Sequence, residues 1–315
     1  MSNTPRIGIA LGSGAARGWA HIGVLRVLLE HGIEPHVVAG SSIGALVGGA
    51  YCSGQLDALE RWVSKLTWWD IVRFSDMQLR KGGFIEGRKL AEYLKRFVAD
   101  RSIESLPKSL AIIATELTTG KEIWLQKGSL SDAVRASCAL PGLFTPVHLD
   151  AQWLVDGGLV NPVPVSVCRA LGADVVIAVN LNGDIAGRHF VRRADKSKDR
   201  ARILSEYPIV AKLIAQVPQS VKTHANHFID NIGRNGDTPG LFDVLAGSIN
   251  IMQDRITRSR MAGDPPNILI EPSLAHLGLL EFDHAKEAIA EGRASAERML
   301  PQIEQIIHEQ AGRQT

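Results

Sequence analysis

The chain has 315 residues, 45% of them hydrophobic, so it can bury a substantial core as one large domain or two small ones. Its 35 Lys and Arg against 33 Asp and Glu leave a net charge of only +2, which gives no electrostatic support for a nucleic-acid partner. The three cysteines are odd in number and lack the paired spacing of a structural zinc site, so we expect reduced thiols in a cytoplasmic protein.

The N-terminal part of the chain alternates short apolar runs with helical patterns. Arg6–Leu11 predicts a strand that ends in glycines, and the apolar residues of 19–29 recur at helical spacing. The run 36–40 predicts a second strand, and 42–53 a second helix. The first apolar run is too brief for a secretory signal, and no uninterrupted apolar run reaches the roughly 18 residues of a membrane-spanning helix.

Further strands follow along the chain. They are predicted at Leu110–Leu117, Glu122–Leu125, Val147–Leu149, Gln152–Val155, Val175–Val179 and Ile268–Ile270. The run Val175–Val179 is wholly apolar and β-branched, as expected of a strand buried on both faces of a parallel sheet. Alternating strands and helices with several hairpins predict an α/β layered domain, closed by a helix at Asp283–Leu300.

The composition changes after Asn180, and we expect residues 181–265 to form an insertion or lid-like segment within one domain that spans 1–315. Basic residues gather at 192–202, where they could meet anionic lipid headgroups as a peripheral membrane contact, although such clusters usually sit in solvent. A helix is predicted from Pro239 onward. Its apolar face would consist of Leu241, Leu245, Ile249, Met252 and Ile256.

A serine between glycines follows the second strand. Residues Gly40-Ser41-Ser42-Ile43-Gly44 fit the G-x-S-x-G pattern, in which a sharp turn from strand to helix exposes the hydroxyl of the central serine. The pattern alone is weak evidence, but its place between a buried strand and a helix is the setting that such a turn requires. We therefore predict that Ser42 is a catalytic nucleophile.

The first strand ends in a glycine-rich loop, Gly12-Ser13-Gly14-Ala15-Ala16-Arg17-Gly18. Since the carboxyl ends of parallel strands share one edge of a sheet, its backbone amides would face Ser42 and could stabilise an oxyanion. Gly12 and Gly14 could also begin a dinucleotide-binding loop. Against this, the third glycine comes one residue late, and the second strand ends in Gly-Ser-Ser instead of an acidic ribose ligand.

Asp156 lies where an apolar strand turns into Gly157-Gly158, so it could orient or deprotonate a serine. An ordinary turn aspartate is an equally good interpretation of the sequence there. Serine hydrolases often place a histidine after the acid, but no late histidine stands in a distinctive setting. The late histidines are His276, His284 and His308.

Four blocks in this order resemble the patatin-like phospholipases. They are Gly12 to Leu25, Gly40 to Gly44, Arg135 to Phe144, and Asp156-Gly157-Gly158 followed by Asn161-Pro-Val-Pro164. The resemblance implies a three-layer α/β/α sandwich with a mostly parallel central sheet, and a Ser-Asp dyad without histidine that hydrolyses acyl esters of lipids. No metal or cofactor is implied.

Carried over by motif, the resemblance makes Ser42 the nucleophile and Asp156 the base. The amides of Ser13, Gly14 and Ala15 would line the oxyanion hole, with Arg17 supporting the loop. Ser13 and Ala15 replace glycines common in the family, and a positive φ at either would be unfavourable. A carboxylesterase or acyl-thioesterase with the same dyad, or a catalytically weak lipid-binding regulator, are the alternatives.

Overall fold

The computed structural model describes residues 5–67, 70, 97, 101–185 and 241–313. The chain divides into one compact unit made of residues 1–187 and 250–315 and a second made of Arg188–Ile249. The second unit lies inside the 181–265 segment that the sequence predicts as an insertion. The expected basic cluster at 192–202 falls outside the described residues.

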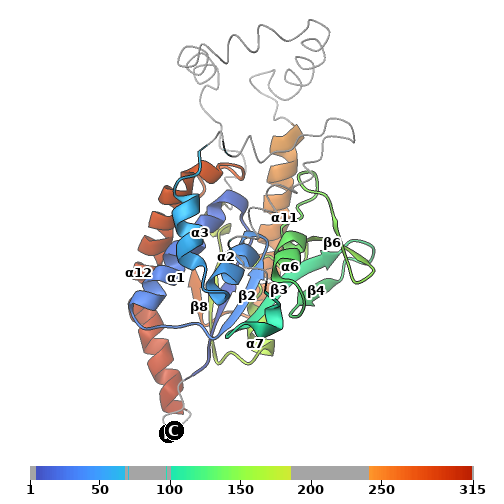
Figure 1. The fold of residues 1–315 in the computed structure, drawn as a ribbon. Coiled ribbons are helices and arrows are strands. Elements are labelled where there is room, and N and C mark those ends of the chain that lie inside the picture. Colours follow the sequence, from blue (N-terminus) through green and yellow to red (C-terminus); the bar gives the residue numbers. More distant parts are fainter. Residues whose placement is uncertain (1–4, 68–69, 71–96, 98–100, 186–240, 314–315) are drawn as a thin grey trace, which may run out of the picture. The chain divides into compact units, whose positions relative to one another are not determined.

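An eight-stranded sheet forms the centre of the main unit (Figure 1). Its strands are β1 (Ile7–Leu11), β2 (Val37–Ser41), β3 (Ser109–Glu116), β4 (Glu122–Leu125), β5 (Val147–Leu149), β6 (Gln152–Asp156), β7 (Val175–Val179) and β8 (Ile268–Ile270). The order is β5-β6-β3-β2-β1-β7-β8, and β4 pairs with β3. Strands β3, β2, β1, β7 and β8 run parallel, whereas β4, β5 and β6 join by antiparallel pairing.

Helices cover both faces of this sheet. They are α1 (Ala20–Glu30), α2 (Ile43–Cys52), α3 (Leu56–Val63), α6 (Leu130–Ser137), α7 (Val165–Ala170), α11 (Leu241–Gly263) and α12 (Ala285–Arg313). Neighbouring strand residues point to opposite faces, so Ile9 packs with α1, α2 and α12, while Ala10 packs with α7. The predicted three-layer α/β/α fold with a mostly parallel sheet is confirmed.

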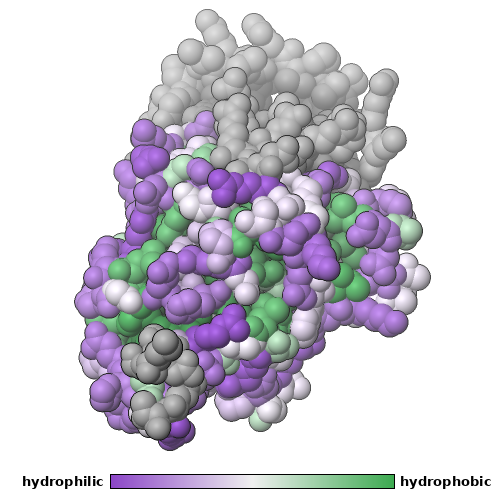
Figure 2. All heavy atoms as spheres, turned by 60° about the horizontal axis from the view of Figure 1, so that its bottom comes forward, coloured by the Kyte–Doolittle hydropathy of each residue, from purple (hydrophilic) through white to green (hydrophobic). Residues whose placement is uncertain are grey.

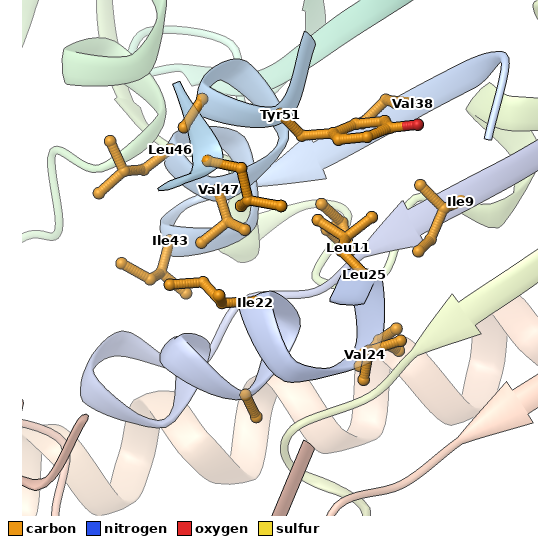
Figure 3. Packing of buried hydrophobic residues seen from close by; sticks show 14 of the residues in the cluster. Ile9, Leu11, Ile22, Val24, Leu25, Val38, Ile43, Leu46, Val47 and Tyr51 are labelled. Atoms are coloured by element: carbon orange, nitrogen blue, oxygen red, sulfur yellow. The ribbon is translucent and has the colours of Figure 1, made fainter. Parts of the chain in front are cut away.

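The core on the first face comes from α1 and α2 lying on β1 and β2. Figure 3 shows Leu25 of α1 beside Leu11 of β1, and Ile22 of α1 facing Ile43 and Val47 of α2. These side chains are buried, and burying one Leu or Ile stabilises the fold by about 1.5 to 3 kcal/mol. The core therefore holds rigidly the two strands that lead into the predicted serine turn and glycine loop.

Two helices differ from their predicted form. Helix α12 continues through Pro301 to Arg313 instead of ending at Leu300. A proline costs a helix a hydrogen bond, but Ile303 beyond it is fully buried in the core, so packing keeps the last turns helical. On α11 the predicted apolar face is wrong: Met252 is 47% exposed, while Gln253, Asp254 and Thr257 are buried.

The face of the molecule in Figure 2 is covered mostly by hydrophilic side chains, with hydrophobic residues showing between them. Among the described helices, none is both long and apolar enough to cross a bilayer.

Candidate active site

Ser42 occupies the turn between β2 and α2, where it takes φ +57° and ψ −123°. This backbone conformation is strained for a residue with a side chain, and such strain is typical of functional turns. Ser42 precedes the first residue of α2 and is partly exposed, whereas the neighbouring Ser41 is fully buried. The chain thus presents the hydroxyl of Ser42 at the carboxyl edge of the sheet, as the sequence pattern predicts.

The sheet itself brings Asp156 to Ser42. Strand β3 lies between them: Ser41 at the end of β2 is in register with Ile113, and Asp156 at the end of β6 with Ala114. Ser42 Oγ donates a hydrogen bond to Asp156 Oδ2 at 2.5 Å. Ser42 and Asp156 are 114 positions apart in sequence. They meet because β3 pairs parallel with β2 on one side and antiparallel with β6 on the other.

Asp156 is fully buried and firmly held. Its Oδ1 accepts the Gly158 amide at 2.7 Å, its own amide donates to the Ala139 carbonyl at 3.0 Å, and its carbonyl accepts the Thr115 hydroxyl at 2.8 Å. Burial raises the pKa of Asp156 to about 6, although the hydrogen bonds from Ser42 and Gly158 favour the ionised form. Its carboxylate can therefore accept a proton near neutral pH more readily than an ordinary aspartate.

Glycines allow the close approach of the elements around the pair. A Cβ at Gly44 would lie 2.1 Å from the Leu11 carbonyl oxygen, and one at Gly157 would lie 2.2 Å from the Ile113 carbonyl oxygen. Both contacts are to backbone, so neither can be relieved by a side-chain rotation. Gly12, Gly18 and Gly40 are likewise closely packed against their neighbours.

We expect Gly44→Ala to lower the free energy of unfolding by about 2 kcal/mol or more, because α2 must move away from β1. Gly263→Ala is the matched control, since a Cβ at Gly263 would meet nothing within 4 Å. Urea unfolding of the two variants measures the difference. Equal midpoints for Gly44→Ala and the wild type would show that the contact is not tight in solution.

The loop after β1 leaves two amides available. The amides of Gly12, Ser13, Ala16 and Arg17 donate to the carbonyls of Val179, Pro162, Leu279 and Gly14 respectively. For the amides of Gly14 and Ala15 the described residues supply no acceptor. Ser13, expected among the oxyanion donors, is thus occupied with Pro162 at 2.8 Å.

This loop packs against a neighbour of each member of the dyad. On one side, a Cβ at Gly18 would lie 2.1 Å from Ile43, the residue after the serine. On the other, a Cβ at Gly158 would lie 2.4 Å from Ser13 Oγ. Ala15 has φ +50°, a conformation that a glycine would adopt without strain. Alanine at this position therefore destabilises the loop by an amount on the order of 1 kcal/mol.

Histidines are absent from the hydrogen bonds that Ser42 and Asp156 make within the described chain. His276 and His284 are exposed and both contact Glu287. His21 is buried and its Nε2 contacts the Gly12 carbonyl at 2.8 Å; burial lowers its pKa to about 4, so the ring is neutral and supports the loop. His308 lies exposed on α12.

The sequence did not single out the residues that support the turn at Ser42. The Ser42 amide donates to Ser137 Oγ at 2.8 Å, and Ser137 is fully buried at the end of α6. Burial raises the pKa of the adjacent Cys138 thiol well above its usual range, so this thiol stays neutral and is a poor nucleophile. Ser137 and Ala139 belong to the block 135–144, which the resemblance singled out without a role.

The described residues contain no group of three His, Cys, Asp or Glu side chains that could hold a metal ion. The arrangement instead offers a hydroxyl bonded to a buried carboxylate, next to two backbone amides at the start of a 3₁₀ helix, Ala15–Trp19. These are the parts needed for acyl transfer through a serine: a nucleophile, a base and donors for a developing negative charge.

The chain is similar to known proteins. The family model described as patatin-like phospholipase matches residues 9–169. An uncharacterized NTE family protein of Mycobacterium tuberculosis is 35% identical over 96% of this chain and 93% of its own length. The neuropathy target esterase sws of Drosophila melanogaster is 35% identical over 56% of this chain and 13% of its own length. A patatin-like phospholipase domain-containing protein of Caenorhabditis elegans is 36% identical over 56% of this chain and 13% of its own. From its motifs, its sheet and these matches, the chain belongs to the patatin-like phospholipase family.

Proposed function

We propose that this protein is a serine acyl hydrolase that cleaves acyl esters of lipids, as a phospholipase A or a lysophospholipase does, through Ser42 and Asp156. The observation that carries the proposal is the 2.5 Å hydrogen bond from Ser42 Oγ to a fully buried carboxylate, made by a serine in a strained turn. Membership of the patatin-like phospholipase family supports a lipid ester as the substrate.

In the proposed mechanism, Asp156 takes the proton of Ser42 as Oγ attacks the ester carbonyl carbon. The negative charge on the carbonyl oxygen is stabilised by the Gly14 and Ala15 amides. The C–O bond to the alcohol then breaks, the alcohol takes the proton from Asp156, and Ser42 keeps the acyl group. Water attacks this acyl-enzyme and gives one proton to Asp156, which returns it to Ser42 as the fatty acid leaves.

The pKa of Asp156 predicts the pH dependence of this reaction. The carboxyl must be ionised to accept a proton, so kcat/KM should be half of its plateau at about pH 6 and fall tenfold per unit below it. A soluble p-nitrophenyl ester measured from pH 4 to 8 at constant ionic strength gives this profile. A midpoint near pH 4, as for an ordinary exposed aspartate, would contradict a base in a buried site.

A substrate panel tests the proposed lipid class. The purified protein would be given lysophosphatidylcholine, phosphatidylcholine, monoacylglycerol, a short p-nitrophenyl ester and an acyl-CoA thioester, beside Ser42→Ala as the control. We expect fatty-acid release from one or more of the lipid esters by the wild type alone. Turnover confined to the short ester or the thioester would favour the carboxylesterase or thioesterase alternative.

A regulatory lipid-binding role is the second candidate. One observation favours it: the Ser13 amide is engaged by Pro162, which leaves two available amides in a loop where Ala15 is strained. Such a protein would bind lipid vesicles but show no turnover in the panel.

A further inference from the structure

The buried face of α11 is polar and lies against the candidate active site. Asn250, Gln253, Asp254 and Thr257 follow the spacing of one helix face, and the last three are at most 8% exposed. The apolar Ile251 and Met252 are instead 40% and 47% exposed. Burying a polar side chain costs free energy unless the side chain makes hydrogen bonds, so the partners of this face indicate what it does.

Asn250 contacts the glycine loop through Arg17. Arg17 Nη2 donates to Asn250 Oδ1 at 2.9 Å, and Arg17 Nε donates to the Gly14 carbonyl at 3.3 Å. The Arg17 amide donates to the same carbonyl at 3.2 Å. Arg17 is only 1% exposed, and although burial lowers its pKa to about 10, it remains charged at neutral pH.

The Gly14 carbonyl and the Ala15 amide belong to one peptide group. In a trans peptide these two groups point in opposite directions, so a carbonyl held by Arg17 directs the Ala15 N–H to the other side. That N–H is one of the two loop amides without an acceptor among the described residues. The Arg17 guanidinium and the Arg17 amide therefore both help to fix the direction of this proposed oxyanion donor.

Gln253, one turn further along α11, lies against Gly158 in the turn that follows Asp156. A Cβ at Gly158 would lie 2.5 Å from Gln253 Nε2, and the Gly158 amide donates to Asp156. Gln253 Oε1 accepts a hydrogen bond from Asn182 Nδ2 at 3.1 Å, which fixes its orientation. One helix face thus contacts both the glycine loop and the turn that carries the carboxylate.

We propose, resting on the proposed function, that Asn250 is a positioning residue for the oxyanion hole: it holds Arg17 so that the Gly14–Ala15 peptide presents its N–H to the reacting carbonyl. The residue acts in the transition state, when negative charge develops, and contributes little to ground-state binding. A purely structural role would instead change stability without a selective effect on kcat.

The test compares Asn250→Ala and Asn250→Leu, which lack the acceptor, with Asn250→Asp, which keeps it. Ile251→Ala, an exposed neighbour on the same helix, is the control. Loss of a whole oxyanion donor costs about 10² to 10³ in rate, and a misdirected one should cost less, so we expect kcat to fall about tenfold. KM should stay within twofold, and Asn250→Asp should keep kcat within about threefold of the wild type.

The assay is hydrolysis of a p-nitrophenyl ester, with thermal unfolding and the rate of fluorophosphonate labelling measured on the same samples. A kcat within twofold of the wild type for Asn250→Leu, or an equal loss in Asn250→Asp, would overturn the positioning role. Should Asn250→Ala not fold, Asn250→Leu, which has the same branching at Cγ, decides in its place. A wild type that neither labels nor turns over would reject the proposed function itself, and the positioning role with it.

Discussion

Ser42→Ala should abolish ester hydrolysis, with a fall in kcat of about 10⁴-fold or more. The reason is that the proposed acyl-enzyme forms on Ser42 Oγ, and among the described residues no other hydroxyl is bonded to the Asp156 carboxylate. The fold should be retained, because the Ser42 amide, not its side chain, makes the bond to Ser137. Steady-state hydrolysis of a p-nitrophenyl ester and circular dichroism measure the two effects.

Ser41→Ala is the matched control for this variant. Ser41 is the neighbouring serine, but its hydroxyl is buried and without a hydrogen-bond partner in the described structure. Removing an unsatisfied hydroxyl should leave activity within a fewfold of the wild type and cost little stability. If Ser41→Ala lost activity as fully as Ser42→Ala, the effect would reflect damage to the turn and not the loss of a nucleophile.

Asp156→Asn should lower kcat/KM by about 10² to 10⁴, the range that a general base contributes. Asparagine has nearly the same shape and can still bond to Gly158 and Ser42, but it cannot take the serine proton. Hydrolysis assays at pH 8, where the wild-type carboxyl is ionised, give the comparison. Activity within fivefold of the wild type would mean that another group accepts the proton.

The same variant should be more stable than the wild type at pH 8. Burial raises the pKa of Asp156 to about 6 in the folded state, above the value of about 3.9 in an unfolded chain. The folded state therefore favours the protonated form, and wild-type stability is lost as the pH rises from about 4 through 6. Urea unfolding should show Asp156→Asn gaining on the order of 2 kcal/mol at pH 8, a gain that disappears at pH 4.

Local patterns were enough to predict the strands and the serine turn. The apolar run 175–179 lies buried between β1 and β8, and the glycines at 40 and 44 flank a serine with positive φ, because these features depend on neighbours in sequence. The meeting of Ser42 with Asp156 depends instead on the pairing of β6 with β3, a register that no local pattern contains. Only the resemblance to a family pointed to Asp156 as the partner of Ser42.

Other features depend on tertiary contacts that oppose local preference. Pro301 predicts a helix end, but the burial of Ile303 outweighs it. The apolar stripe on α11 predicts a buried apolar face. The helix instead turns a polar face inward, where Asn250 accepts a hydrogen bond from Arg17 and Gln253 accepts one from Asn182. The signal in the sequence was that Asn250 and Gln253 stand three residues apart, on one face of a helix. A pattern of hydrophobic residues alone does not reveal such a polar face.

Covalent labelling with a fluorophosphonate tests most directly whether Ser42 is a nucleophile activated by Asp156. Intact mass and peptide mapping should show one adduct per chain, located on Ser42. Labelling should be absent in Ser42→Ala and at least a hundredfold slower in Asp156→Asn. A wild-type protein that takes up no label at pH 8, or that carries it on another residue while Ser42 stays unmodified, would contradict the account.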